Sequence, residues 1–147
     1  MLILDLVTTL SLALMIGIEL CVAVFIDPIL NRLDPLTQAE VLRHFARRLG
    51  NAMPFWYGAN LLLLIAESIL RRGQLDSVLL YCATALWAMA ILMTLLFLVP
   101  INNRMMRLKG AMSDADRREH QKWDTLHRSR IIVLTVAALC SLIAMSL

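Results

Sequence analysis

Charged residues are scarce in this sequence: Asp, Glu, Lys and Arg make up only 17% of the 147 residues, against about 25% in a typical soluble domain. Hydrophobic residues make up 60%, and the mean hydropathy is +0.73. This shortage leaves little of the chain for a soluble domain. The net charge of +3, with acidic residues mixed among the basic ones, argues against nucleic acid as a partner and for contact with membrane lipid headgroups.

Cysteine is scarce as well. Cys21, Cys82 and Cys140 all lie in apolar stretches, and no C-x-x-C pair occurs, which argues against a membrane thiol oxidoreductase and for packing roles. The H-E-x-x-H and E-x-x-H spacings of dedicated metal sites are also missing, so no metal site is predicted. Haem held by His44 and His127, with Glu19 as a third candidate ligand, remains an alternative, as does a bound quinone; otherwise no cofactor is expected.

The abundant feature is long apolar stretches. A helix that spans a bilayer needs roughly 17–25 mostly apolar residues, and the sequence predicts four such helices, at about residues 2–26, 54–70, 77–99 and 123–147. The fold class is therefore all-α, a polytopic membrane protein built as a four-transmembrane-helix bundle. Residues 1–147 are expected to form a single transmembrane domain.

The segment between the first two predicted helices has the pattern of an amphipathic helix at about residues 36–50, "LTQAEVLRHFARRLG". Leu42 and Leu49 lie on one side, whereas Arg47 and Arg48 lie largely away from it. A basic amphipathic helix most simply lies on lipid headgroups. We expect this helix on the cytoplasmic surface.

The basic residues also predict the orientation of the chain. All but Arg71 and Arg72 of the 14 Lys and Arg residues lie between helices 1 and 2, between helices 3 and 4, or in the first turns of helix 4, where Arg128 and Arg130 are found. By the positive-inside rule these two loops are cytoplasmic, and both termini face outward.

Glu19 is an ionisable residue within the first apolar helix, where a charge is costly. It points about 200° away from Gly17, and so away from the small residues Ala13, Gly17 and Cys21, which are spaced to let another helix approach closely, as in a homo-oligomer. Three interpretations of Glu19 stay open: a polar site, a hydrogen bond within the bundle, or a subunit interface.

Several polar residues are predicted at a similar depth, near the cytoplasmic ends of the helices. Trp123, His127 and Arg130 share one helix face, either as an interfacial anchor or as part of a site, and the imidazole favours a site because it can act as an acid or base near neutral pH. Residues that can converge on one cytoplasmic-facing cavity are Glu19, His44, Asn60, Asn102, Trp123, His127 and Arg130.

Several motifs together point to a family. The first helix contains Gly17 and ends near Pro28. The later motifs are "RHFARRLGNAMPFW" before the second helix, "FLVPINNRM" at the end of the third and "WDTLHRSR" at the start of the fourth. Over nearly its whole length the chain resembles the anthrone-oxygenase-like family of small four-helix membrane proteins. Most of its bacterial members are described only as a domain of unknown function, and we expect this chain in a bacterial inner membrane.

Characterised fungal relatives in that family oxidise a polycyclic phenolic anthrone to an anthraquinone, using oxygen without an evident cofactor. The resemblance implies that His127 removes a proton from the phenol or the activated CH₂, while Arg130 and Asn102 stabilise the anion. Trp123 would stack on the flat ring. Glu19, Asn60 and His44 are further candidates for binding the substrate.

Three functions fit these observations. The first is a cofactor-free oxygenase or oxidoreductase that acts on a lipophilic aromatic or quinone-like molecule. The second is a non-catalytic protein that binds lipid or another hydrophobic small molecule. The third is a structural subunit of a membrane complex, in which Glu19 contacts a partner helix.

Overall fold

The computed structural model describes residues 1–73 and 77–146. Within those residues it is all-helical, as the sequence predicts, and the helices join into four long rods. The first rod is α1 (Leu2–Cys21), the π-helical η1 (Val22–Ile26) and α2 (Asp27–Leu30); the second is α3 (Pro35–Leu70); the third is α4 (Ser77–Met93), the π-helical η2 (Thr94–Leu98) and α5 (Val99–Met106); the fourth is α6 (Asp114–Ser146).

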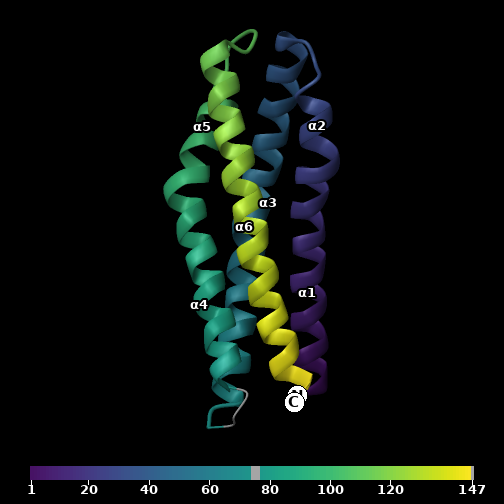
Figure 1. Ribbon diagram of the computed structural model, residues 1–147, viewed down its shortest axis with the longest axis vertical. Helices are drawn as coiled ribbons and strands as arrows, with labels where there is room; N and C mark the ends of the chain where they lie inside the picture. The colour runs from purple at the N-terminus through teal and green to yellow at the C-terminus, as the bar shows by residue number, and fades with distance from the viewer. Residues whose placement is uncertain (74–76, 147) are drawn as a thin grey trace.

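The rods run antiparallel in sequence order (Figure 1). α1 and α4 each pack against both α3 and α6, so every rod contacts two neighbours around a square. The two termini lie together at one end of the bundle, which we call the terminal end. The turn between α2 and α3 and the loop between α5 and α6 lie at the opposite end, which we call the polar end.

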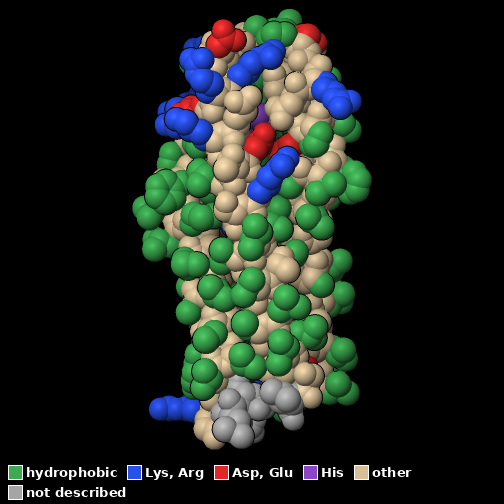
Figure 2. All heavy atoms as spheres, viewed as in Figure 1, with side chains coloured by type: hydrophobic (Ala, Val, Ile, Leu, Met, Phe, Trp, Pro, Cys, Tyr) green, Lys and Arg blue, Asp and Glu red, His purple; other side chains and the backbone are tan. Residues whose placement is uncertain are grey.

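All four rods are long and apolar enough to cross a membrane. Hydrophobic side chains cover the outer surface over most of the length of the bundle, whereas charged side chains gather toward the polar end (Figure 2). Large apolar residues such as Leu10, Phe25 and Ile132 are more than 60% exposed, which suits lipid rather than water. The chain is thus an integral membrane protein. The kind of membrane and the cytoplasmic side remain predictions.

The helix predicted at 36–50 and the one predicted at 54–70 are a single helix, α3. Asp34 caps its start by accepting two backbone N–H groups at 3.1 Å. Gly50 does not adopt the left-handed conformation that commonly ends a helix, and Pro54 removes only one backbone hydrogen bond. The predicted break between these helices is therefore wrong.

The apolar face of the first part of α3 packs on protein. Ala39 and Leu42 belong to a buried cluster with Leu30, Ile101 and Met105, so this segment closes the polar end of the bundle. The last helix also begins earlier than predicted, at Asp114 rather than near residue 123, because Ser113 and Asp116 hydrogen-bond to each other across the first turn.

The small residues Ala13, Gly17 and Cys21 lie on the exposed face of α1. A Cβ atom added at Gly17 would have no described atom within 4 Å. These residues therefore do not serve packing inside this bundle. Their predicted role in a homo-oligomer remains a prediction.

Each π-helical segment comes just before a proline, η1 before Pro28 and η2 before Pro100. In an α-helix the proline ring clashes with the carbonyl four residues earlier, here that of Val24 or Leu96. Both carbonyls lie within the π-helical turn, whose wider spacing makes room for the ring. Both distorted segments border the candidate site described below: η1 contributes Val22 and η2 contributes Thr94.

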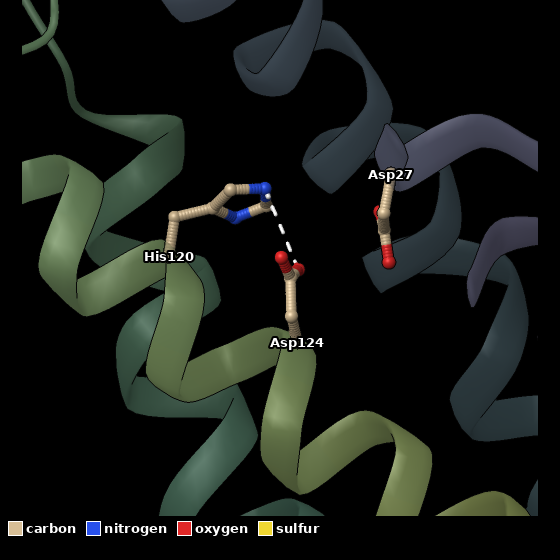
Figure 3. Close-up of side chains that lie close together, drawn as sticks. All are labelled: Asp27, His120 and Asp124. Atoms are coloured by element: carbon tan, nitrogen blue, oxygen red, sulfur yellow. Dashed lines mark ion pairs between the residues drawn. The ribbon is translucent and has the colours of Figure 1, made fainter. Parts of the chain in front are cut away.

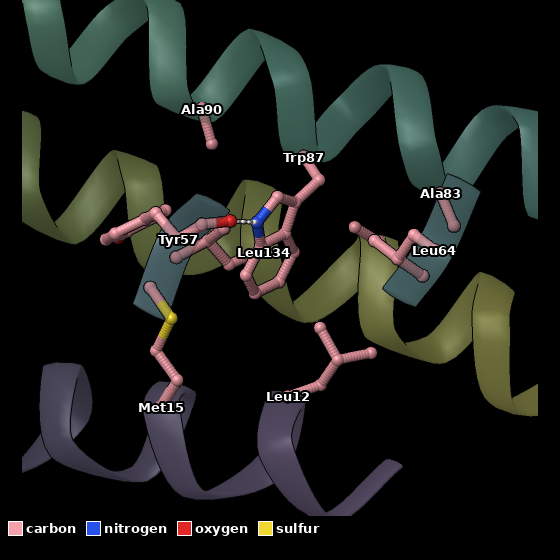
Figure 4. Packing of buried hydrophobic residues seen from close by; sticks show 9 residues of the cluster. Leu12, Met15, Tyr57, Leu64, Ala83, Trp87, Ala90 and Leu134 are labelled. Carbon is pink, nitrogen blue, oxygen red and sulfur yellow. Dashed lines mark hydrogen bonds between the residues drawn. The ribbon is translucent and has the colours of Figure 1, made fainter. Parts of the chain in front are cut away.

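The main core of the bundle is a cluster of buried hydrophobic residues, seen from close by in Figure 4. Leu12, Met15, Leu64, Trp87 and Leu134 are all at most 2% exposed and belong to one cluster from four helices. Trp87 donates its Nε1–H to the backbone carbonyl of Tyr57 at 3.2 Å, and the two rings lie 5.9 Å apart. The core thereby positions Tyr57.

Replacing Trp87 with Ala should lower the free energy of unfolding by about 3–5 kcal/mol, because it opens a large cavity in a close-packed core. Trp87→Phe should cost less, since it keeps one aromatic ring and loses the hydrogen bond to Tyr57 and the remaining volume of the indole. Reversible unfolding in mixed micelles measures both changes. Leu92→Ala on the same helix is the control: Leu92 is 55% exposed, and an equal loss there would contradict the assigned core.

Candidate functional site

A cavity of about 390 Å³ lies inside the bundle, toward the polar end, within the size range of sites for small molecules. All four rods contribute to its wall, which is mostly apolar and includes Val22, Met53, Leu61, Ile91 and Leu98. The polar side chains in the wall are Glu19, Tyr57, Thr94, Asn102, Trp123, His127 and Arg130.

The carboxylate of Glu19 is the centre of this polar wall. Glu19 is 2% exposed, and its Oε1 accepts the hydroxyl of Tyr57 at 3.0 Å. Its Oε2 accepts Nη2–H of Arg130 at 2.5 Å and lies 3.0 Å from Nδ1 of His127. α1, α3 and α6 are joined through this one side chain.

The guanidinium of Arg130 is buried beside it. Besides Glu19, its Nη2 contacts Nδ1 of His127 at 2.9 Å, and its Nη1 donates to Oγ1 of Thr94 at 3.0 Å. It also lies over the ring of Tyr57, 5.3 Å from the centroid. The buried Nε–H has no hydrogen-bond partner among the described residues. One donor of this cation is therefore still available.

The contacts of His127 indicate which ring nitrogen carries a proton. Nε2 lies 3.1 Å from the backbone carbonyl of Glu19, and a carbonyl only accepts, so we assign a proton to Nε2. Nδ1 then accepts from Arg130 when the ring is neutral, and donates to Glu19 when the ring is charged. His127 and Glu19 thus form a buried pair, joined through Nδ1 and Oε2.

Trp123 forms a stack along α6. Its ring lies parallel to that of His127, with centroids 4.7 Å apart, and to that of His120, with centroids 6.1 Å apart, both at 14°. Because imidazoles lie against the indole, Trp123 supports His127 and has less of its own face available to a ligand.

Asn102 reaches the cavity from α5. Its Nδ2 donates to the backbone carbonyl of Ala46 at 3.2 Å, and a Cβ atom added at Gly50 would lie 3.0 Å from Nδ2. Gly50 therefore permits the close approach of Asn102 to α3. The carboxamide oxygen remains as an acceptor, since no described residue hydrogen-bonds to it.

Five residues predicted from the sequence thus share this cavity, namely Glu19, Asn102, Trp123, His127 and Arg130. Asn60 does not. It is fully buried, but it bonds Ser11 at 2.6 Å and the sulfur of Met15 at 3.1 Å, between α1 and α3. His44 is exposed and lies outside the wall.

Sequence reasoning missed Tyr57 and Thr94. Tyr57 follows Phe55 and Trp56, and such a run of aromatic residues is typical of a membrane interface. In the structure α3 continues through this run, and Tyr57 is buried in the cavity wall. Thr94 is the only hydroxyl residue in η2, and that isolation within an apolar helix was the available signal.

The fold and site define a class: a four-helix integral membrane protein with a largely apolar internal cavity that ends on buried Glu, His and Arg side chains. The sequence profile described as anthrone oxygenase matches residues 43–140, and the chain belongs to that family. The match includes every polar residue of the cavity wall except Glu19. Neither the curated proteins nor the solved structures contain a match to this chain.

Removing one partner of the Glu19–Arg130 pair should be more harmful than removing both. Glu19→Ala leaves a buried, unpaired guanidinium and should lower the free energy of unfolding by about 3–5 kcal/mol, whereas a combined Glu19→Leu and Arg130→Met variant should stay close to wild type. Unfolding in mixed micelles measures both. Arg128→Ala, which removes an exposed arginine of the same helix, is the control. A double variant as unstable as Glu19→Ala would show that the pair does not act as a unit.

Proposed function

We propose that this protein is a membrane-bound oxygenase without a bound cofactor, which oxidises a flat, lipophilic phenolic or quinone-like molecule inside the bundle. The observation that carries the proposal is Arg130, a buried cation that lines a mostly apolar cavity and whose Nε–H has no hydrogen-bond partner among the described residues. A buried donor without an acceptor is costly. A ligand oxygen removes that cost.

The cavity favours one chemical class of ligand. Its apolar wall suits a hydrocarbon ring system, and the positive charge of Arg130 suits an oxygen that carries negative charge, such as a phenolate or enolate. Glu19 already balances Arg130, so a neutral ligand that becomes anionic only during the reaction fits better than one that enters charged. A phenolic anthrone has these properties.

The residues support a proton-abstraction mechanism. The His127–Glu19 pair accepts a proton from the activated CH₂ of the substrate, and Arg130 stabilises the resulting enolate. The electron-rich carbanion reduces O₂, and with the returned proton it forms a hydroperoxide. Loss of water from the hydroperoxide leaves a ketone. The balance is one CH₂ and one O₂ converted to one C=O and one H₂O.

The remaining polar residues have supporting roles. Tyr57 and Thr94 hold Glu19 and Arg130 in place through their hydroxyls, and Trp123 holds the ring of His127. Asn102, with its free carboxamide oxygen, is proposed to accept a phenolic O–H at the polar end of the cavity. Entry from the lipid is supported by Ile18, Pro54 and Leu95, which line the cavity and are exposed on the outer surface.

The test uses detergent-purified protein with 1,8-dihydroxyanthrone as the probe. Anthraquinone absorbance and oxygen uptake should rise together, in equal amounts, above the spontaneous rate. His127→Ala and His127→Gln should both lower the enzymatic rate by about 10²–10⁴-fold, the usual contribution of a general acid or base. His44→Ala is the matched control, because His44 is an exposed histidine outside the cavity, and it should retain the wild-type rate.

Binding is measured in parallel, through quenching of tryptophan fluorescence by anthraquinone and mass spectrometry of extracted ligands. Arg130→Gln should weaken anthraquinone binding, whereas His127→Gln should change it little. Saturable, Arg130-dependent binding with no oxidation above the spontaneous rate would contradict the oxygenase proposal and favour a non-catalytic binding protein. Absence of both would contradict the proposed ligand class.

A further inference from the structure

Three ionisable side chains meet in a second place, nearer the polar end than Glu19. Asp27 comes from α2, and His120 and Asp124 lie one turn apart on α6 (Figure 3). One ligand atom from each lies within 4.8 Å of the other two. All three are buried, with exposed fractions of 2%, 3% and 9%.

These buried groups have few partners: His120 pairs with Asp124, and Asn31 donates one hydrogen bond to Asp124. No Lys or Arg forms an ion pair with Asp27 or Asp124 within the described part of the chain. Three atoms have no hydrogen-bond partner there: Oδ2 of Asp27, Oδ1 of Asp124 and Nε2 of His120. The last two are 3.5 Å apart. Two carboxylates and one imidazole in this setting call for a cation.

The surroundings orient the cluster. Asn31 donates its Nδ2–H to Oδ2 of Asp124 at 3.3 Å, and Gln38 in turn donates to Asn31 at 3.4 Å. These contacts hold Asp124 through Oδ2, while Oδ1 faces His120 without a hydrogen bond; neighbouring groups commonly orient a metal ligand in this way. Asp27 and His120 also line a small cavity of about 50 Å³. There is room beside the cluster for a solvent molecule.

We propose that Asp27, His120 and Asp124 bind a divalent transition-metal ion. Two carboxylates neutralise its charge, and the imidazole favours Zn²⁺, Co²⁺, Fe²⁺ or Mn²⁺ over Mg²⁺ and Ca²⁺. Ligand atoms about 2.1 Å from an ion are at most about 4.2 Å apart, so the side chains have to close only slightly from the observed spacing. Water in the small cavity supplies further ligands.

This ion would join α2 to α6 next to the main cavity. The ring of His120 stacks on Trp123, which stacks on His127, and Trp123 lines both cavities. The metal site would therefore fix one wall of the larger site. The proposal does not depend on the proposed oxidation, because the ligands and contacts that carry it are separate from Glu19, His127 and Arg130.

The test starts from detergent-purified full-length protein stripped with a chelator and dialysed against Zn²⁺, Mn²⁺ or Co²⁺. Elemental mass spectrometry should find about one ion per chain, and Co²⁺ should give a visible spectrum typical of nitrogen and oxygen ligands. The metal should also raise the unfolding temperature, because it binds only the folded chain. Asp27→Asn and His120→Ala should weaken binding beyond the roughly 10–100-fold expected for loss of an outer neighbour.

His44→Ala and Asp114→Asn are the matched controls, an exposed histidine and an exposed aspartate, and both should bind metal like wild type. His127→Gln should also keep the metal, which separates this proposal from the oxygenase proposal. Equal binding by wild type and His120→Ala would overturn the site. A second result would also overturn it: the wild-type protein retains no ion, and the Asp27→Asn variant is more stable than the wild type. The two carboxyl groups would then share a proton instead of binding a metal.

Discussion

A carboxylate and a guanidinium that leave water inside a bilayer must meet, because each alone costs several kcal/mol there. Glu19 on α1 and Arg130 on α6 meet in this way, 111 residues apart in the sequence. Their pairing fixes the rotation of both helices about their axes. Tyr57 and Thr94 then satisfy donors and acceptors that the pair leaves, so α3 and η2 are fixed as well. The cavity follows from this arrangement.

The helices are distorted close to this pair. The wider π-helical turns precede the two prolines and lie beside the charged cluster, one after Glu19 and one beginning at Thr94. Toward the terminal end the rods are regular and the core is closely packed around Trp87. The regularly packed part of the bundle thus supports the part that contains the π-helical turns and the buried charged side chains. Such a division is expected where a site is built into a small bundle, because only a well-packed scaffold can hold strained and charged groups in place.

Buried carboxylates also occur nearer the polar end. Asp27 is as deeply buried as Glu19, and Asp124 is only 9% exposed, but no arginine or lysine forms an ion pair with them in the described residues. In the main site the cation is a side chain; in the second cluster we infer that it is a metal ion. The stacked rings of His120, Trp123 and His127 connect the two. Both clusters therefore contact the same face of α6.

The sequence by itself determined the fold class, since apolar runs long enough to cross a bilayer and the absence of strand patterns leave few alternatives. It also indicated Glu19, because an ionisable residue in an apolar helix is costly. It indicated His127 and Arg130 because they share a helix face with Trp123 and because an imidazole can act as an acid or base. It did not determine which residues meet. Asn60 and Asn102 look equivalent in the sequence, but packing buries the first between α1 and α3 and places the second in the cavity. Only the tertiary structure decides this, because helix rotation depends on contacts between residues far apart along the chain.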